Sequence, residues 1–451
     1  MTDALPSGLL LAFYGDDFTG STATLEALAF AGLKTVLLFD TPDEDLLAAF
    51  PDCRAIGIAG LSRARSPAWM TEHLPPVFAR LKAAQPALAH YKICSTFDSA
   101  PQIGSIGKAV ELGADAFGND WTPVFTAVPS LARWQVFGNL FAGAQGEAYR
   151  IDRHPVMMRH PVTPMAEADL RLHLGKQTAW KVGLVDIAAM KAGQAELRIA
   201  RETADGAKIL LIDGLDDETL ALAGGLMWEG RHARPFVAGS QGVEYALIAW
   251  WRSQGLLADA PTLAAITRVD RIAAVSGSCS PLTARQIACA EANGFAAIAI
   301  NAHLAVDDRA WQAELARAQH LALEALSTGR DALIHSAKGP DDPAVALLNQ
   351  AIAASGVSQE EVSRRIGSGL GDVLSQLVRV AKLTRAVVSG GDSSGQACIA
   401  MGLMGVTALA ALAPGAPLCL ARSRHAHLDG LEIALKGGQM GQEDFFLAAK
   451  G

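Results

Sequence analysis

Cysteine is scarce in this sequence of 451 residues, and its six cysteines are scattered without a C-x-x-C pair. That spacing argues against a disulfide framework and against a zinc site. The N-terminus lacks the charged start, the long apolar core and the small-residue cleavage site of a secretory signal peptide. We therefore expect a protein of the reducing cytoplasm.

Positive charge is also limited, because 38 Lys and Arg residues face 46 Asp and Glu residues, and no basic run occurs. The net charge of −8 argues against nucleic acid or an anionic membrane surface as a partner. Residues 401–421 carry no charge over about the length of a membrane span. Their glycines and prolines divide them into a helix end, a short strand and a turn, so we expect buried core there and no membrane segment.

The common nucleotide fingerprints are missing as well. The sequence contains no G-x-x-x-x-G-K-[ST] and no strand-linked G-x-G-x-x-G with an acidic residue downstream, which argues against a P-loop enzyme and a dinucleotide dehydrogenase. It contains no G-x-S-x-G nucleophile elbow. His425 and His427 have no third ligand within reach in the sequence, so we expect no metal site formed by the protein.

What the sequence does contain is an alternation of short apolar runs with alanine- and leucine-rich helical runs. This pattern predicts an α/β protein, and the length predicts two domains, each a mostly parallel sheet covered by helices. The irregular stretch from Arg252 to Pro261 separates the predicted domains 1–252 and 262–451. A cleft between two domains is the usual place for a small-molecule site, so we expect the active site there. The predicted strands are 9–14, 35–39, 55–59, 90–94, 123–128, 181–185, 208–212, 235–238, 272–276, 296–300, 332–335, 386–389 and 417–420.

Two adjacent carboxylates, Asp16 and Asp17, follow the first predicted strand and precede a helix expected from Thr22 to Gly32. In open α/β sheets, ligands bind at the carboxyl ends of strands, which makes this pair a candidate site. The alternative is that Asp17 or Thr19 only caps the helix.

A second polar cluster, from Lys92 to Ser99 (KICSTFDS), also ends a predicted strand. Lys92 can pair with a substrate carboxylate, and Asp98 can bind substrate hydroxyls. An internal ion pair between Lys92 and either Asp17 or Asp98 is the alternative interpretation of the same residues.

The second half contains three glycine- and serine-rich turns, at 276–281, 389–395 and 436–441. Glycine lets the backbone approach an anion closely, and the N-terminus of a following helix attracts negative charge. Each turn alone is weak evidence, because such turns are common for conformational reasons. Together they favour a site for a nucleoside triphosphate.

Six motifs in this order resemble the four-carbon acid sugar kinase family, which was formerly a family of unknown function. The motifs are DDFTGS (16–21), KICSTFDS (92–99), HPVTPM (160–165), SGSCSPLT (276–283), GGDSSG (390–395) and KGGQMG (436–441). The resemblance implies a two-domain kinase that uses ATP and Mg²⁺, with an acid-sugar-binding N-terminal domain and a nucleotide-binding C-terminal domain.

The resemblance also implies roles for individual residues. The residues expected to face the acid sugar are Asp16, Asp17, Lys92, Ser95, Thr96 and Asp98. Those expected to face ATP are Ser276, Ser278, Gly390, Gly391, Asp392, Ser393, Gly437 and Gly438. Either Asp17 on the sugar side or Asp392 on the phosphate side would take the proton from the attacking hydroxyl.

The STFDS form looks more like the branch of the family acting on 3-oxo acid sugars, such as 3-oxo-tetronate or 3-oxo-isoapionate. Two positions depart from the family pattern: Ala23 replaces a frequent acidic residue, and Ser393 replaces a threonine while keeping its hydroxyl. A sugar-acid binding or sensing protein without catalysis is the competing hypothesis, and an oxidoreductase is a third. The composition allows a homodimer without requiring one.

Overall fold

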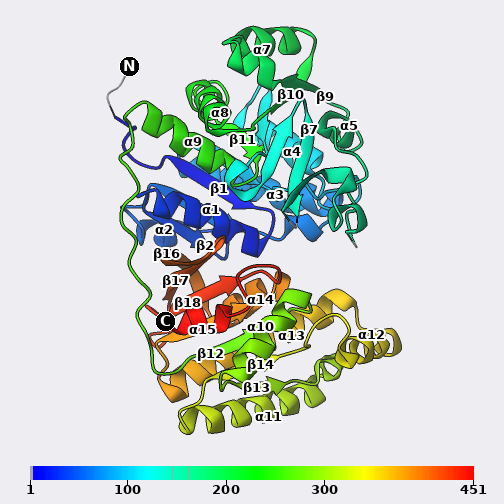
Figure 1. Cartoon of the computed structure of the whole chain (residues 1–451), viewed down its shortest axis with the longest axis vertical. Helices are drawn as coiled ribbons and strands as arrows, with labels where there is room; N and C mark the ends of the chain where they lie inside the picture. The colour runs from blue at the N-terminus through cyan, green and yellow to red at the C-terminus, as the bar shows by residue number, and fades with distance from the viewer. Residues whose placement is uncertain (1–3, 145, 161) are drawn as a thin grey trace. The chain divides into compact units, whose positions relative to one another are not determined.

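The computed structural model describes residues 4–144, 146–160 and 162–451, apart from the side chains of Glu44 and Asp392. Contacts divide the chain into two compact units (Figure 1). Unit 1 comprises the chain up to Asp17 together with Ala27–Thr35 and Thr41–Pro261. Unit 2 comprises Phe18–Glu26, Val36–Asp40 and Thr262–Gly451. The chain therefore passes from unit 1 into unit 2 directly after the two adjacent carboxylates.

Unit 1 contains a parallel sheet in the order β3-β1-β4-β11-β5-β10-β9. Its strands are β1 (Leu11–Gly15), β3 (Ala55–Ala59), β4 (Leu88–Lys92), β5 (Thr122–Phe125), β9 (Lys181–Val185), β10 (Ala207–Ile212) and β11 (Phe236–Gly239). Strands β1 and β3 are buried along their whole length, as expected for strands covered on both faces. The predicted strands 55–59 and 181–185 coincide with β3 and β9.

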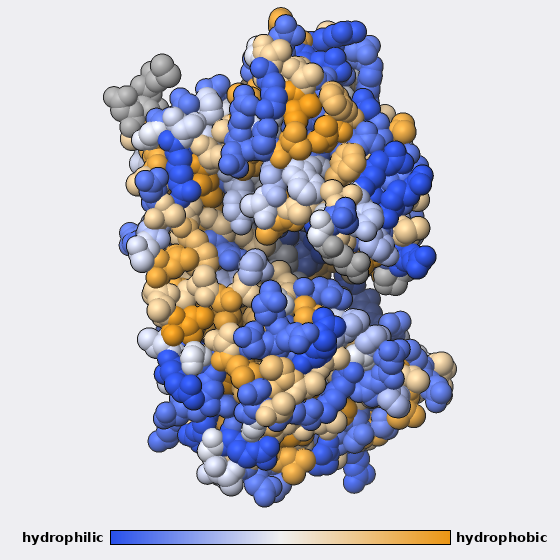
Figure 2. Space-filling model, viewed as in Figure 1, coloured by the Kyte–Doolittle hydropathy of each residue, from blue (hydrophilic) through white to orange (hydrophobic). Residues whose placement is uncertain are grey.

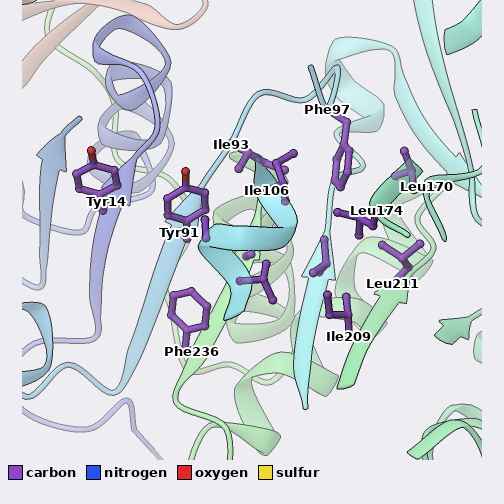
Figure 3. Close-up of a cluster of buried hydrophobic side chains, with 14 of the residues drawn as sticks. Tyr14, Tyr91, Ile93, Phe97, Ile106, Leu170, Leu174, Ile209, Leu211 and Phe236 are labelled. Atoms are coloured by element: carbon purple, nitrogen blue, oxygen red, sulfur yellow. The ribbon is translucent and has the colours of Figure 1, made fainter. Parts of the chain in front are cut away.

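Helices cover both faces of this sheet. Tyr91 of β4 packs with α3 and α4 in a buried apolar cluster, part of which Figure 3 shows around Tyr14, Tyr91 and Phe236. The adjacent residue on the strand, His90, points to the other face and contacts Glu244 of α9. The helices of unit 1 are α2 (Glu44–Ala48), α3 (Pro67–Ala83), α4 (Ile106–Phe117), α5 (Leu170–Leu174), α6 (Ile187–Lys191), α7 (Ala195–Ala204), α8 (Asp217–Gly230) and α9 (Gly242–Ser253).

Unit 1 also contains a small antiparallel sheet that the alternation pattern did not predict. It consists of β6 (Arg133–Val136), β7 (Asn139–Ala144) and β8 (Glu147–Arg150), in that order. Helix α5 begins at Leu170, because the side chain of Asp169 accepts a hydrogen bond from Arg171 N and caps the helix there.

Unit 2 contains a sheet in the order β13-β14-β12-β15-β18-β17-β16-β2. The strands from β13 to β18 in this order are parallel, and the remaining pairs are antiparallel. The bounds are β2 (Thr35–Leu38), β12 (Ala273–Ser276), β13 (Ala296–Ala299), β14 (Ala332–His335), β15 (Arg385–Ser389), β16 (Leu403–Ala413), β17 (Ala416–Ser423) and β18 (Glu432–Lys436). The α/β prediction with mostly parallel sheets is confirmed.

The secondary structure predicted for residues 401–421 is wrong. Instead of a helix end, one short strand and a turn, they form most of the antiparallel hairpin β16–β17, which closes at Pro414 and Gly415. The run LMGVTALAALA is rich in alanine and leucine, which favour helices in isolation. Pairing with β17 on one side and β2 on the other outweighs this local preference.

The helices of unit 2 surround its sheet (Figure 1). They are α10 (Pro281–Ala292), α11 (Asp308–Ser327), α12 (Pro343–Ser355), α13 (Gln359–Ala381), α14 (Asp392–Ala400) and α15 (Phe445–Lys450). Hydrophilic and hydrophobic side chains are interspersed over α11 in Figure 2. Helix α13 approaches α14 closely, because a Cβ added at Gly367 would lie 2.7 Å from Gln396 Cβ.

Helix α1 (Phe18–Phe30) begins four residues earlier than predicted, and its first part belongs to unit 2. There, Thr22 Oγ1 donates to Gly415 O over 2.7 Å, and Gly415 N donates to a carboxylate oxygen of Glu26. Thr22 and Glu26 are one helical turn apart, so this face of α1 holds both backbone groups of the hairpin tip. Ala23 is buried and lies near the hairpin tip, since a Cβ added at Gly415 would be 3.6 Å from Ala23 Cβ.

The contact of Glu26 with the hairpin predicts how stability changes with pH. Burial raises the pKa of Glu26 from 4.5 to about 7 in the folded protein, although the hydrogen bond from Gly415 opposes the shift. Stability should therefore fall as the pH rises from about 4.5 to about 7, because only the unfolded chain releases this proton freely. We expect Glu26→Gln to raise the melting temperature at about pH 8 and to leave it nearly unchanged at about pH 4.5.

The matched control is Glu72→Gln, which changes an exposed glutamate on α3. Calorimetry of both variants at the two pH values checks the prediction. An equal change in melting temperature for Glu26→Gln at both pH values would contradict it.

In the described part of the chain, no helix is long and apolar enough to cross a membrane. All six cysteines are free. Groups of three or more His, Cys, Asp or Glu side chains suited to a metal ion are likewise absent among the described residues.

Candidate active site

The two polar strand ends of unit 1 lie side by side. Strands β1 and β4 are adjacent and parallel, with Gly15 opposite Lys92 in the register. Asp16 N donates to Lys92 O over 2.8 Å, which fixes the start of the Asp16–Asp17 segment against the end of β4. Because parallel strands end at the same edge, the sheet itself brings together the two clusters.

Arg63 joins the two carboxylates, and the sequence reasoning did not single it out. It lies in a turn of 3₁₀-helix (Ser62–Ala64) directly after β3, the other neighbour of β1. Its Nε donates to Asp16 Oδ2 over 3.1 Å, and its Nη2 donates to Asp16 Oδ1 over 2.6 Å and to Asp17 Oδ1 over 2.5 Å. Arg63 follows the predicted strand 55–59. The argument that selected Asp16 and Lys92, as polar residues after a strand end, could therefore have selected Arg63 as well.

Lys92 lies within ion-pair distance of Asp17, with 3.8 Å between Nζ and Oδ1. The internal ion pair considered from the sequence is therefore present. The Lys92 side chain is only 2% exposed, whereas that of Asp17 is 16% exposed and that of Asp16 is 5% exposed. Of the two adjacent carboxylates, Asp17 is thus the more accessible to a ligand.

The turn after β4 holds its polar groups in a short chain of hydrogen bonds. Thr96 Oγ1 donates to Asp98 Oδ1 over 2.5 Å, and Cys94 Sγ lies 2.9 Å from Thr96 Oγ1. Burial works against ionisation of Asp98, but Arg63 and the hydrogen bonds from Thr96 and Cys94 outweigh it and lower the pKa of Asp98. Burial and Asp98 raise the pKa of the Cys94 thiol to about 11, so it stays protonated. Ser95 is half-buried in the same turn.

The backbone at Phe97 is held in a left-handed conformation with φ of 60°, which is uncommon for a bulky residue. Ser99 Oγ donates to Phe97 O over 2.9 Å and lies 2.9 Å from His173 Nε2. Burial lowers the pKa of His173 to about 4, so the ring is neutral at ordinary pH. Figure 3 shows the Phe97 side chain beside Leu170 and Leu174. These contacts support the strained turn that presents Asp98.

In unit 2, the three glycine-rich turns leave adjacent parallel strands. Ser276 at the end of β12 is in register with Ser389 of β15, and Ser389 is in register with Lys436 of β18. Gly277 N donates to Ser389 O over 2.9 Å, and Gly390 N donates to Lys436 O over 2.9 Å. The structure therefore brings together turns that begin at residues 276, 389 and 436 of the sequence.

In two of these turns, an added Cβ would crowd a serine hydroxyl. A Cβ at Gly390 would collide with Ser393 Oγ, and one at Gly438 would lie 2.6 Å from Ser278 Oγ. By contrast, nothing lies within 4 Å of a Cβ added at Gly391, so that glycine borders open space.

Two helices begin in the same region, α10 after Ser280 and α14 after Gly391. Ser280 Oγ accepts from Thr283 N over 3.0 Å and caps α10. The backbone N–H groups and the dipole at a helix N-terminus attract phosphate. Asp392 is the first residue of α14, and its side chain is not among those that the structure describes.

A polar pocket of about 240 Å³ lies on the surface of unit 2 beside α11 and α13, and it includes Trp311 and Asp372. None of the residues predicted for the site lines it. Pro161 of the HPVTPM motif lies outside the described residues, whereas Thr163 and Met165 are buried.

Comparison with known protein families identifies the two halves of the chain. A family described as a sugar-binding N-terminal domain matches residues 11–247, and one described as a nucleotide-binding C-terminal domain matches residues 273–446. The protein is thus an α/β enzyme of the kind that joins a sugar-binding domain to a nucleotide-binding domain. The chain belongs to the four-carbon acid sugar kinase family.

Two relatives show how closely the chain matches other members of this family. It is 48% identical to a 3-oxo-isoapionate kinase of Paraburkholderia graminis over 443 residues, which cover 98% of this chain and 94% of the relative. It is 30% identical to a 3-oxo-tetronate kinase of Burkholderia multivorans, covering 97% of this chain and 96% of the relative.

Solved structures show the same fold. A crystal structure from Salmonella typhimurium LT2, provisionally named a tRNA synthase, matches with a TM-score of 0.76 at 23% identity and covers 98% of this chain and 99% of that chain. A Haemophilus influenzae protein matches with a TM-score of 0.72 at 24% identity and the same coverage. At this identity the likeness concerns the fold alone.

Proposed function

We propose that this protein is an ATP-dependent kinase that phosphorylates a hydroxyl of a 3-oxo acid sugar, and that 3-oxo-isoapionate is its preferred substrate. The observation that carries the choice of substrate is the 48% identity over 98% of the chain with a 3-oxo-isoapionate kinase. The 3-oxo-tetronate kinases resemble the chain less, at 30% identity for that of Burkholderia multivorans.

On the sugar side, we assign Lys92, with the hydroxyl of Ser95, to the substrate carboxylate. Thr96, whose hydroxyl proton already goes to Asp98, is assigned to a substrate hydroxyl, from which its oxygen can accept. Asp16, Asp17 and Asp98 are assigned to the substrate hydroxyls, because carboxylates accept hydrogen bonds from them. The position of these residues at the carboxyl ends of β1 and β4 supports the assignment. Arg63 is added to the residues chosen from the sequence, as the cation that keeps Asp16 and Asp17 together.

On the nucleotide side, we assign the phosphates of ATP to the backbone of the three glycine-rich turns. The residues assigned are Ser276, Ser278, Gly390, Gly391, Asp392, Ser393, Gly437 and Gly438. ATP would be bound as its Mg²⁺ complex, in which the metal ion would supply positive charge to the transferred group. The N-termini of α10 and α14 supply further positive potential.

Phosphoryl transfer then needs positioning and a group that takes the hydroxyl proton, for which Asp17 and Asp392 remain the candidates. We keep the domains predicted from the sequence, 1–252 and 262–451, and assign the acid sugar to the first and the nucleotide to the second. The active site in a cleft between the domains stays a prediction from the sequence, as do the cytoplasmic location and the homodimer.

Ala23 gives no reason to choose one acid sugar over another. It stands where the family often has an acidic residue, and in this chain it is buried near the hairpin tip. We therefore assign it to packing and not to the substrate.

The test is a kinase assay with Mg-ATP against a panel of tetronates, 3-oxo-tetronates and 3-oxo-isoapionate. We expect ADP release and a phosphorylated product, with kcat/KM at least about tenfold higher for 3-oxo-isoapionate than for the four-carbon acids, a ratio that differences of a few substrate atoms commonly give. Binding of these acids without any ADP release would favour the competing sugar-acid binding protein. Highest kcat/KM on a 3-oxo-tetronate would overturn the choice of substrate but not the kinase activity.

A further inference from the structure

Lys436, the last residue of β18, is one of the largest fully buried side chains of the protein. Its ammonium group donates to Thr283 Oγ1 over 3.2 Å, to Ser389 Oγ over 3.0 Å and to Gly437 O over 3.1 Å. The three acceptors belong to the three segments that form the predicted phosphate site. All three ammonium protons are thus used to hold these segments together.

The segments are connected further around this ammonium group. Thr283 Oγ1 lies 3.0 Å from Ser278 Oγ and 3.1 Å from Gly438 O, and Ser280 Oγ also donates to Gly438 O. A change in the position of Lys436 would therefore displace the turn at 276–281 and the turn at 436–441 together.

The positive charge of Lys436 has no negative partner among the described residues. Its three acceptors are neutral, and the nearest aromatic face, that of Phe445, has its centroid 5.7 Å from Nζ. The charged groups on the neighbouring elements β15, β18, α10 and α15 are paired with others: Arg385 with Glu432, Arg285 with Glu443, Lys338 with Glu291, and Lys450 with Asp331.

A buried charge without a partner is costly, and proteins seldom keep one without a use. We propose that Lys436 is a positioning residue of the nucleotide site, which holds the three glycine-rich turns together and supplies to the nucleotide phosphates a positive charge that no described side chain pairs. It acts through the turns, because its own hydrogen bonds are already used. The inference rests on the nucleotide site proposed above.

The protonation of Lys436 gives this proposal a measurable signature. Burial lowers the pKa of Lys436 to about 8, so close to half of the unliganded protein has a neutral amine at that pH. Bound phosphates favour the charged form and raise this pKa. Nucleotide binding should therefore take up about half a proton at about pH 8 and almost none at about pH 6.

The experiment is isothermal titration calorimetry of the full chain with Mg-ADP, in pairs of buffers that differ in ionisation enthalpy. We expect proton uptake at about pH 8 in the parent protein. In Lys436→Met we expect no uptake at this pH and an affinity at least about tenfold lower, because a charge a few ångströms away is lost from a site shielded from water. Glu26→Gln is the control, since Glu26 titrates at about pH 7, and it should keep the uptake at the higher pH.

The melting temperature separates this role from a merely structural one. Because Lys436→Met removes an unpaired buried charge, we expect its melting temperature to stay the same or rise while nucleotide affinity falls. A lower melting temperature with unchanged affinity would overturn the proposal. If Lys436→Met does not fold, Ser389→Ala is the second variant, because it removes one hydrogen-bond acceptor from the Lys436 ammonium group. We expect it to shift the proton uptake to lower pH. An unshifted pH profile of proton uptake would also overturn the proposal.

Two further outcomes distinguish the inference from the proposed function. Tight binding of Mg-ADP by the parent without proton uptake would overturn the role of Lys436 and leave the kinase function intact. Failure of the parent to bind Mg-ADP at all, together with no ADP release in the kinase assay, would overturn both.

Discussion

Replacing Arg63 with methionine should abolish measurable kinase activity and lower the stability of unit 1 by up to about 3 kcal/mol, the lower end of the cost of breaking a buried ion pair, because the Arg63 side chain is 24% exposed. The guanidinium group donates to both Asp16 and Asp17 and interacts electrostatically with Asp98. Without it, these carboxylates would face each other with Lys92 as the nearby cation. They would then repel each other or bind protons, and either response disrupts the sugar side of the site.

Arg63→Lys refines this prediction. Lysine keeps the charge, but it lacks the planar fork that contacts Asp16 through two nitrogens and Asp17 through one of them. We expect it to recover much of the stability and little of the activity. The measurements are denaturant unfolding and kcat/KM with the acid sugar.

The matched control is Arg80→Met, which changes an exposed arginine near the end of α3. It should alter neither stability nor activity. If Arg63→Met retained parental activity with a normal unfolding curve, Arg63 would have no role at the site, and the grouping of the three carboxylates would lose its functional meaning.

One of the two variants Asp17→Asn and Asp392→Asn should lose at least about a thousandfold in turnover, within the range that general-base catalysis contributes. Each substitution keeps the size of the side chain and removes its ability to take a proton. The variant of the true base should bind Mg-ADP with an affinity within about threefold of the parent, because a base acts in the transition state more than in nucleotide binding. Single-turnover kinetics and nucleotide titration measure the two effects separately.

Asp17 and Asp392 lie in different surroundings. Asp17 is the more exposed of the two adjacent carboxylates, and it directly precedes α1. Asp392 begins α14 within the phosphate-type turns. Small and equal losses of turnover in both variants would rule out both residues as the base. A loss confined to nucleotide affinity in Asp392→Asn would assign that residue to ATP binding.

Much of the site could be predicted because strand ends are visible in a sequence. The apolar runs before Asp16 and before Ser389 indicated where strands end, and the register of β1 with β4 and of β12 with β15 then brings the polar groups to one edge in each unit. In the same way, the alternation of runs predicted β3, β9 and β14 residue for residue.

The elements that the sequence did not predict have one physical cause in common. They depend on contacts with segments that are distant in the sequence. The run 403–413 has a composition that favours helix, and it is a strand because β17 and β2 flank it. The small sheet β6–β8 has short, partly exposed strands with weak apolar patterns. The first part of α1 belongs to unit 2, although the residues before it belong to unit 1, and no local pattern marks that division.

The sequence by itself determined the α/β class, the acid sugar kinase family and the segments that carry polar groups, because strand period, turn composition and motif order are local properties of a chain. The tertiary structure alone decided that Arg63 joins Asp16 to Asp17 and that Lys436 joins the three glycine-rich turns. Ion pairs and buried hydrogen bonds depend on which strands become neighbours in a sheet, and neighbours such as β15 and β18 are fixed by packing, not by proximity in the sequence.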